Sequence, residues 1–155
     1  MVSSNKRGRR YVSRDIDIDE HDPLVHVECI VKASEDVNKV IKAVSNVING
    51  IKGMEHIESN TGGINKVVVD THGLSALETI KMQIHARQVM NTFKRIMLNN
   101  KSSDCKSTWF YLNKQAAYAG VVSICEYEDE SPLGPIKVTI TDHKGILSII
   151  EWLTL

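Results

Sequence analysis

Paired cysteines, long apolar runs and an excess of either charge are all missing from this 155-residue sequence. Its three cysteines are odd in number and form no C-x-x-C pair, which argues against a disulfide framework and predicts a reducing compartment. No apolar run approaches the roughly 18 residues that a membrane helix needs. Nineteen basic residues balance nineteen acidic ones, so no overall positive charge points to nucleic acid. We therefore expect a cytoplasmic protein with no membrane association.

The first 22 residues are highly polar and carry their charges in two blocks of opposite sign. Five basic residues from Lys6 to Arg14 precede five acidic ones from Asp15 to Asp22. No apolar stretch follows the basic block, so these residues do not resemble a secretory signal. We predict that residues 1–22 are a flexible charged leader and that residues 23–155 form a single α+β domain.

Charge counted by segment is more informative than the neutral total. Residues 79–114 contain seven basic residues and one acidic residue, a balance of +6, whereas residues 115–155 have a balance of −4. The two segments could pair with each other between chains, or the basic one could contact RNA.

Hydrophobic periodicity predicts strands at residues 24–32, 54–59, 64–70, 107–112, 121–125 and 136–141. Helical spacing predicts a helix with Ser34 as its N-cap and a last helix with Asp142 as its cap. Residues 113–120 read as a connection. The order β-α-β-β-α-(α)-β-β-β-α predicts an α+β fold with two layers, in which helices cover one face of a mixed, mostly antiparallel sheet.

Residues 74–99 resemble one long helix, but their apolar side chains point in two directions. Leu77, Ile80 and Ile84 lie on one side at 100° per residue, while Phe93 and Ile96 lie roughly opposite. We therefore predict a break near residues 85–87. After the break, three cations fall away from the apolar stripe and form a candidate phosphate-binding face: Arg87, Lys94 and Arg95. The alternative is an ordinary solvated helix face.

One segment carries a family resemblance. Residues 110–120, with the string Asn-Lys-Gln-Ala-Ala-Tyr at positions 113–118, precede Ser-Pro-Leu-Gly-Pro at 131–135 and Ile-Glu-Trp-Leu at 150–153. Together they resemble an uncharacterised archaeal family of predicted RNA-binding proteins, some of them proposed to be exosome-associated. The resemblance spans roughly residues 24–154. It implies a fold similar to the 5S-RNA-binding ribosomal protein or, more loosely, to double-stranded-RNA-binding domains, but it implies no catalytic residues.

The same segment supplies three further candidates for RNA contact: Lys114, Gln115 and Tyr118. A cation suits phosphate, an amide suits a base edge and an aromatic ring suits base stacking. In the alternative interpretation Asn113 and Gln115 satisfy loop backbone groups and Tyr118 caps the core.

These features favour a non-enzymatic RNA-binding protein, an accessory of RNA processing. The first alternative is a protein-interaction or self-associating subunit, a homo-oligomer or part of an RNA-processing complex with no direct nucleic-acid role. The second is a small enzyme that uses the acidic run at residues 126–130, although neighbouring carboxylates there should splay apart. His26 and Cys29 have the wrong parity to share a strand face, so we predict neither a metal site nor a cofactor.

Overall fold

The computed structural model describes residues 18, 20–51, 53, 55–59 and 65–155 of the chain. Most of the predicted leader, residues 1–22, lies outside these residues. Within the part that is described, Ile18 is buried in the core, and the His21 side chain bonds to the carboxylate of Asp142 through Nδ1. The packed unit therefore includes Ile18 and His21 as well as described residues from 23 onward.

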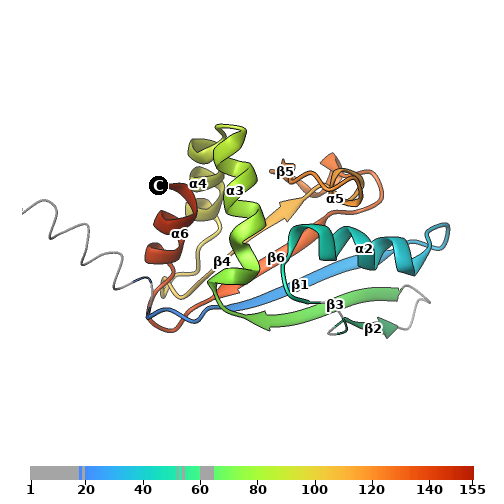
Figure 1. Ribbon diagram of the computed structural model, residues 1–155, viewed down its shortest axis with the longest axis horizontal. Coiled ribbons are helices and arrows are strands. Elements are labelled where there is room, and N and C mark those ends of the chain that lie inside the picture. Colours follow the sequence, from blue (N-terminus) through green and yellow to red (C-terminus); the bar gives the residue numbers. More distant parts are fainter. Residues whose placement is uncertain (1–17, 19, 52, 54, 60–64) are drawn as a thin grey trace, which may run out of the picture.

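A six-stranded sheet forms one layer of the described structure (Figure 1). Its strands run in the spatial order β2-β3-β1-β6-β4-β5, and every described pair is antiparallel. The central strand β1 therefore pairs with β3 on one side and with β6, the last strand of the chain, on the other. The strands are β1 (Leu24–Val31), β2 (His56–Ser59), β3 (Asn65–His72), β4 (Ser107–Leu112), β5 (Ile124–Cys125) and β6 (Ile136–Thr141).

Helices form the second layer and cover one face of the sheet. Alternate residues of β1, β4 and β6 are buried, as expected when one sheet face meets the core and the other meets water. Figure 1 shows α3, α4 and α6 gathered at one end and α2 toward the other. The helices are α2 (Val37–Val47), α3 (Glu78–Ala86), α4 (Met90–Asn99), α5 (Lys114–Tyr118) and α6 (Leu147–Thr154), with short 3-10 turns η2 (Leu74–Leu77) and η3 (Glu128–Glu130). The predicted α+β class and element order are confirmed.

The predicted break in the long helix is also confirmed. Helix α3 ends at Ala86 and α4 begins at Met90, with Gln88 between them at φ 58°. This turn redirects the chain, so that Ile84 of α3 and Phe93 of α4 are both buried. Two partly independent apolar faces thus reach the same core, which a straight helix could not achieve.

Four local predictions were wrong in whole or in part. Asp36, not Ser34, caps α2, because its carboxylate accepts a hydrogen bond from the Asn38 amide at 2.9 Å. Asp142 does not cap the last helix: it is buried, accepts from the Lys144 amide in a turn, and leaves α6 to begin at Leu147. The predicted strand at 121–125 shrinks to β5, and the predicted connection at 113–120 contains helix α5.

The helix-free face of the sheet carries a charged cluster on β1 and β3. His26 bonds to Asp70 through Nδ1 at 2.7 Å and to Glu28 through Nε2 at 3.0 Å. Burial opposes protonation of the His26 ring, but these hydrogen bonds outweigh it and raise its pKa above the ordinary 6.5. Cys29 faces the core instead, so the predicted separation of His26 from Cys29 is confirmed.

A glycine at position 88 should stabilise the protein. A residue with a Cβ pays about 1 kcal/mol or more in the left-handed region, whereas glycine enters it freely. We expect Gln88→Gly to raise the free energy of unfolding by a few tenths to about 1 kcal/mol in urea titration, because the added chain entropy offsets part of the relief. Met82→Gly, at an exposed position inside α3, is the control and should cost about 1 kcal/mol. A loss of stability in Gln88→Gly would contradict the strain argument.

The contribution of His26 to stability should depend on pH. Because its folded pKa is raised, the favourable interaction is fully present below about pH 6.5 and is lost as the pH rises through the folded value. We expect His26→Asn to reduce the free energy of unfolding more at pH 5.5 than at pH 8, with both values measured by urea titration. The exposed His143→Asn serves as the control. Equal losses at the two pH values in His26→Asn would refute the effect.

Candidate functional site

A pocket of about 340 Å³ lies where α2 meets α5, and all three candidates of the Asn-Lys-Gln-Ala-Ala-Tyr string line it. Local capping explains why α5 forms there. Asn113 accepts a hydrogen bond from the Ala116 amide at 2.9 Å, and Asn46 of α2 donates to the carbonyls of Ala117 and Tyr118. The pocket is lined by Ser34, Glu35, Asp36, Lys39, Val40, Ala43, Lys114, Gln115, Tyr118 and Leu133.

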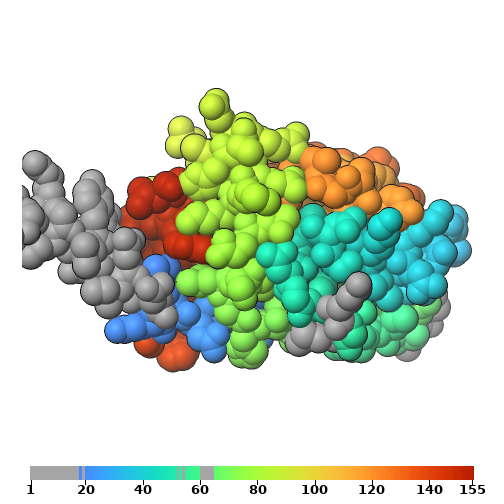
Figure 2. Space-filling view, viewed as in Figure 1, coloured from blue at the N-terminus to red at the C-terminus, as the bar shows by residue number. Residues whose placement is uncertain are grey.

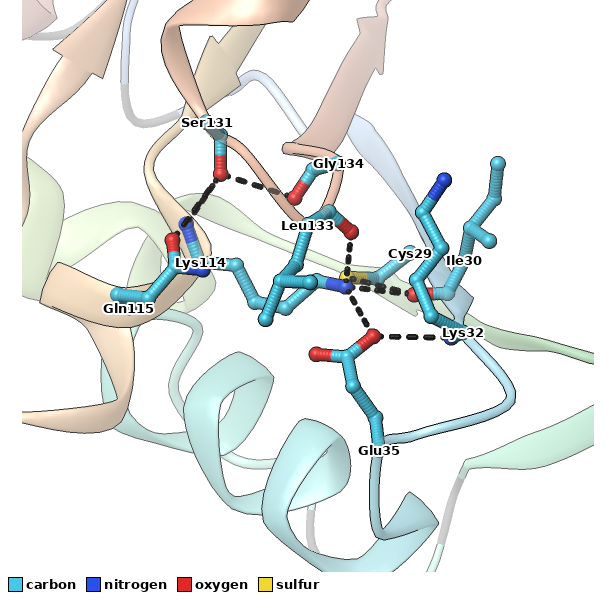
Figure 3. A network of polar contacts seen from close by, with 9 residues as sticks. All are labelled: Cys29, Ile30, Lys32, Glu35, Lys114, Gln115, Ser131, Leu133 and Gly134. Carbon is cyan, nitrogen blue, oxygen red and sulfur yellow. Dashed lines mark hydrogen bonds and ion pairs between the residues drawn. The ribbon is translucent and has the colours of Figure 1, made fainter.

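The Lys114 side chain lies buried beneath the pocket and contributes little to its accessible surface. Its side chain is 4% exposed, and its ammonium donates to Ile30 O at 2.7 Å, Glu35 Oε1 at 2.8 Å and Leu133 O at 2.6 Å (Figure 3). An ammonium has three donors, and all three are used inside the protein. Its charge is paired within the chain and sealed from solvent, which argues against the predicted contact between Lys114 and an RNA phosphate.

The groups around Lys114 are held by a second set of bonds. Glu35 Oε1 also accepts from the Lys32 amide at 2.9 Å, which fixes the turn between β1 and α2. Buried Ser131 accepts from the Lys114 amide at 3.3 Å and donates its proton to Gly134 O at 2.9 Å. Burial raises the pKa of the neighbouring Cys29 thiol to about 12, more than the nearby ammonium lowers it. The network thus joins β1, the start of α2, α5 and the turn before β6.

Gln115 and Tyr118 lie at the mouth of the pocket. Both are exposed, and the Tyr118 residue retains 41% of its accessible surface. Lys42 of α2 places its ammonium 5.1 Å from the centre of the Tyr118 ring. The alternative interpretation of Tyr118 as a cap on the core does not fit this exposure. For Asn113 the backbone-satisfying alternative is correct, since it caps α5.

The basic positions of α3 and α4 separate into different environments. Arg87 is exposed and donates to Val122 O at 3.1 Å, beside the segment that follows α5. Arg95 forms two hydrogen bonds with Glu126, which raise the pKa of Arg95 and lower that of Glu126. Lys94 borders a separate hollow between α4 and α6, together with Glu151. Figure 2 shows α2, α5 and α3 meeting on one face of the molecule.

Sequence reasoning missed Lys39 and Lys42. They belong to residues 23–78, a segment with a negative balance, and nothing in it signals a basic surface. The only available signal was their spacing of three residues, which puts both on one side of α2. The contact between α2 and α5 brings Lys39 into the pocket lining and Lys42 over the Tyr118 ring. That contact depends on the helix at 114–118, which the sequence pattern did not predict.

The acidic run at residues 126–130 does not converge on one point. Glu126 pairs with Arg95, and Glu130 turns back to accept from the amides of Glu126 and Tyr127. Among the described residues, no group of three or more histidine, cysteine or acidic side chains is arranged to hold a metal ion. Within the same part of the chain, no helix has the length and apolar character needed to cross a membrane.

Comparison with known proteins identifies relatives over most of the chain. A family model described as RNA binding matches residues 24–141. A UPF0201 protein of Sulfurisphaera tokodaii is 34% identical over 129 residues, which cover 83% of this chain and 84% of the relative. Another UPF0201 protein, from Sulfolobus acidocaldarius, is 34% identical over 131 residues, covering 84% and 86%.

Solved structures share the fold. A UPF0201 protein from Methanococcus jannaschii superposes with a TM-score of 0.68 at 24% identity, covering 84% of this chain and 92% of that one. A DUF54 protein from Methanothermobacter thermautotrophicus gives 0.59 at 18% identity, covering 88% and 100%. At these identities the likeness concerns the arrangement of strands and helices alone.

Removal of the Lys114 ammonium should be costly. Lys114→Met keeps the apolar stem but removes the cation that pairs with Glu35 and the donor to two partly buried carbonyls, those of Ile30 and Leu133. We expect a loss of about 3 kcal/mol in the free energy of unfolding, measured by urea titration. Lys94→Met, at an exposed helical position, is the control and should change stability by about 0.5 kcal/mol or less. A loss below about 1 kcal/mol in Lys114→Met would mean that the network is not structural.

Proposed function

The chain belongs to the family whose model is described as RNA binding, and from this membership we propose that the protein binds RNA and catalyses no reaction on it. The match over residues 24–141 carries the proposal, because it includes strands β1 to β6 and helices α2 to α5. In a cell such a protein serves RNA processing as an accessory that holds or presents its RNA.

The surface that we assign to this function lies around α5. Lys39 and Lys42 approach α5 from α2, and Arg87 reaches the segment after α5 from the end of α3. RNA binding draws much of its affinity from cations that neutralise phosphates and release counterions. These exposed cations can supply this electrostatic part of the affinity, although the net charge of the chain is zero.

Lys94 and Arg95 extend the surface along α4. The Arg95–Glu126 pair is open to solvent, with half of the Arg95 side chain exposed, so a phosphate can compete with Glu126 for the guanidinium. Lys94 is exposed one residue earlier, on a different side of the helix. We assign both a supporting role at the margin of the surface.

Gln115 and Tyr118 can contact bases, which the phosphate-binding cations do not. An amide can donate to or accept from a base edge, and an exposed phenol ring offers a stacking face. Both stand at the mouth of the pocket, next to the cations of α2. Recognition of RNA thus combines a phosphate-binding margin with a small polar and aromatic centre.

Self-association driven by charge has less support. The basic segment 79–114 and the acidic segment 115–155 already pair in part within one chain, where Arg95 binds Glu126. Lys114 is likewise neutralised inside the chain, by Glu35. Fewer unmatched charges then remain to join two copies.

Salt dependence tests the proposal. Binding of a structured RNA hairpin can be measured by fluorescence anisotropy, and we expect its affinity for the unmodified protein to fall steeply as salt rises. At any one salt concentration the double variant Arg87→Ala, Lys94→Ala should bind more weakly than the unmodified protein, to the same extent for all RNA sequences. The slope of log affinity against log salt should fall by about one unit per lost phosphate contact. Stability should change by about 0.5 kcal/mol or less per substitution, because both side chains are exposed.

The matched control is Lys106→Ala, Lys144→Ala, which also removes two exposed cations but acts where β4 begins and in the turn after β6. It should leave the slope unchanged. Absence of RNA binding at low salt, or a flat salt response of the unmodified protein, contradicts the proposed function. An unchanged slope in the Arg87, Lys94 variant contradicts the assigned surface and not RNA binding itself.

A further inference from the structure

We infer that the pocket between α2 and α5 receives one unpaired nucleotide of the bound RNA, with the base inside and the phosphate at the rim; this rests on the proposed function. The pocket has a volume of about 340 Å³, at the small end of the range for ligand sites. It is too small for a paired helix and has room for one nucleotide. Its inner wall is apolar, formed by Val40, Ala43 and Leu133, as a base face requires.

The aromatic ring at the rim gives the base a stacking partner. Tyr118 is exposed, and α5 holds it through the hydrogen bond from Asn46 to its carbonyl. A base that stacks on this ring would lie next to the Lys42 ammonium, 5.1 Å from the ring centre. Lys42 and Lys39, one turn apart on α2, can then meet the phosphate of the same nucleotide outside the pocket.

Apart from Lys39, whose ammonium is assigned to the phosphate, the polar groups that line the pocket favour a base over a phosphate. Lys114 is fully used by its three acceptors and offers no positive charge to a ligand. Glu35 engages Lys114 and the Lys32 amide through Oε1, and no hydrogen bond to its Oε2 is found within the described residues (Figure 3). A carboxylate oxygen with unused lone pairs repels phosphate and accepts from N–H groups.

This acceptor also selects among bases. Adenine, cytosine and guanine carry an exocyclic amino group on the edge that pairs in a helix, whereas uracil presents carbonyl oxygens there on either side of a single N–H. Carboxylates accept from such amino groups. Gln115, whose amide oxygen lies 3.4 Å from the Ser131 hydroxyl, has its NH₂ group available to a base acceptor. The pocket should therefore take uridine least well.

The test compares RNA hairpins that differ at one position. One hairpin is fully paired, and four others carry a single bulged A, C, G or U in the same stem; affinities for the unmodified protein come from fluorescence anisotropy at fixed salt. We expect the A, C and G bulges to bind about tenfold tighter than the paired hairpin, as one stacked base provides. The U bulge should show a smaller gain.

A bulge also bends RNA, and the bend alone could change the affinity. Two variants distinguish binding of the base in the pocket from an effect of the bend. Tyr118→Ala should bring the affinity ratio between bulged and paired hairpins close to one. Tyr127→Ala removes an aromatic ring that is more exposed than Tyr118 but lies on the acidic run, outside the pocket lining, and should keep the ratio. Tyr118→Phe retains the stacking face and should keep the ratio as well.

A measurement on the unmodified protein covers the case in which Tyr118→Ala fails to fold. With 2-aminopurine as the bulged base, its fluorescence should fall on binding, because stacking on an aromatic ring quenches it. Equal affinity for bulged and paired hairpins, or fluorescence that does not fall, overturns the inference while RNA binding stands. Absence of binding to every hairpin removes the proposed function and the inference together.

Discussion

A buried ion pair between Lys114 and Glu35 determines how the helical layer meets the sheet. Neither partner is near the other in sequence, and the ammonium also holds two backbone carbonyls, one at the end of β1 and one in the turn before β6. A single cation thereby fixes where α5 lies against α2. The pocket, the exposed Tyr118 ring and the adjacent lysines of α2 all follow from that placement.

Much of the fold could be predicted because it rests on periodic burial. The alternation in β1 and the opposed apolar faces of residues 74–99 are local patterns, and they led to the sheet and to the break before Met90. The errors have local causes as well. Helix α5 has five residues and is too short for a periodic signal. The Asp142 carboxylate bonds to His21 and to the Lys144 amide of a turn, and no local pattern reveals these partners.

The site was harder to predict than the fold because a side chain's role depends on its partners. Three residues of the string at 113–118 line the pocket between α2 and α5, yet the cation among them is buried while Gln115 and Tyr118 are exposed. A count of +6 for residues 79–114 treated Arg95 and Lys114 as free charges, whereas acids at positions 126 and 35 neutralise them. Those partners lie 31 and 79 residues away along the chain, beyond the reach of segment arithmetic.

The position of β1 also affects how the chain can fold during synthesis. This strand, Leu24–Val31, occupies the middle of the sheet and needs β6, Ile136–Thr141, as one of its two neighbours. Synthesis must therefore proceed at least to the end of β6, Thr141, before the sheet can close. Until then one edge of β1 stays open to pairing with other chains, and contacts so distant in sequence form slowly. The architecture thus delays completion of the sheet until β6 is available and exposes β1 to early strand pairing between copies.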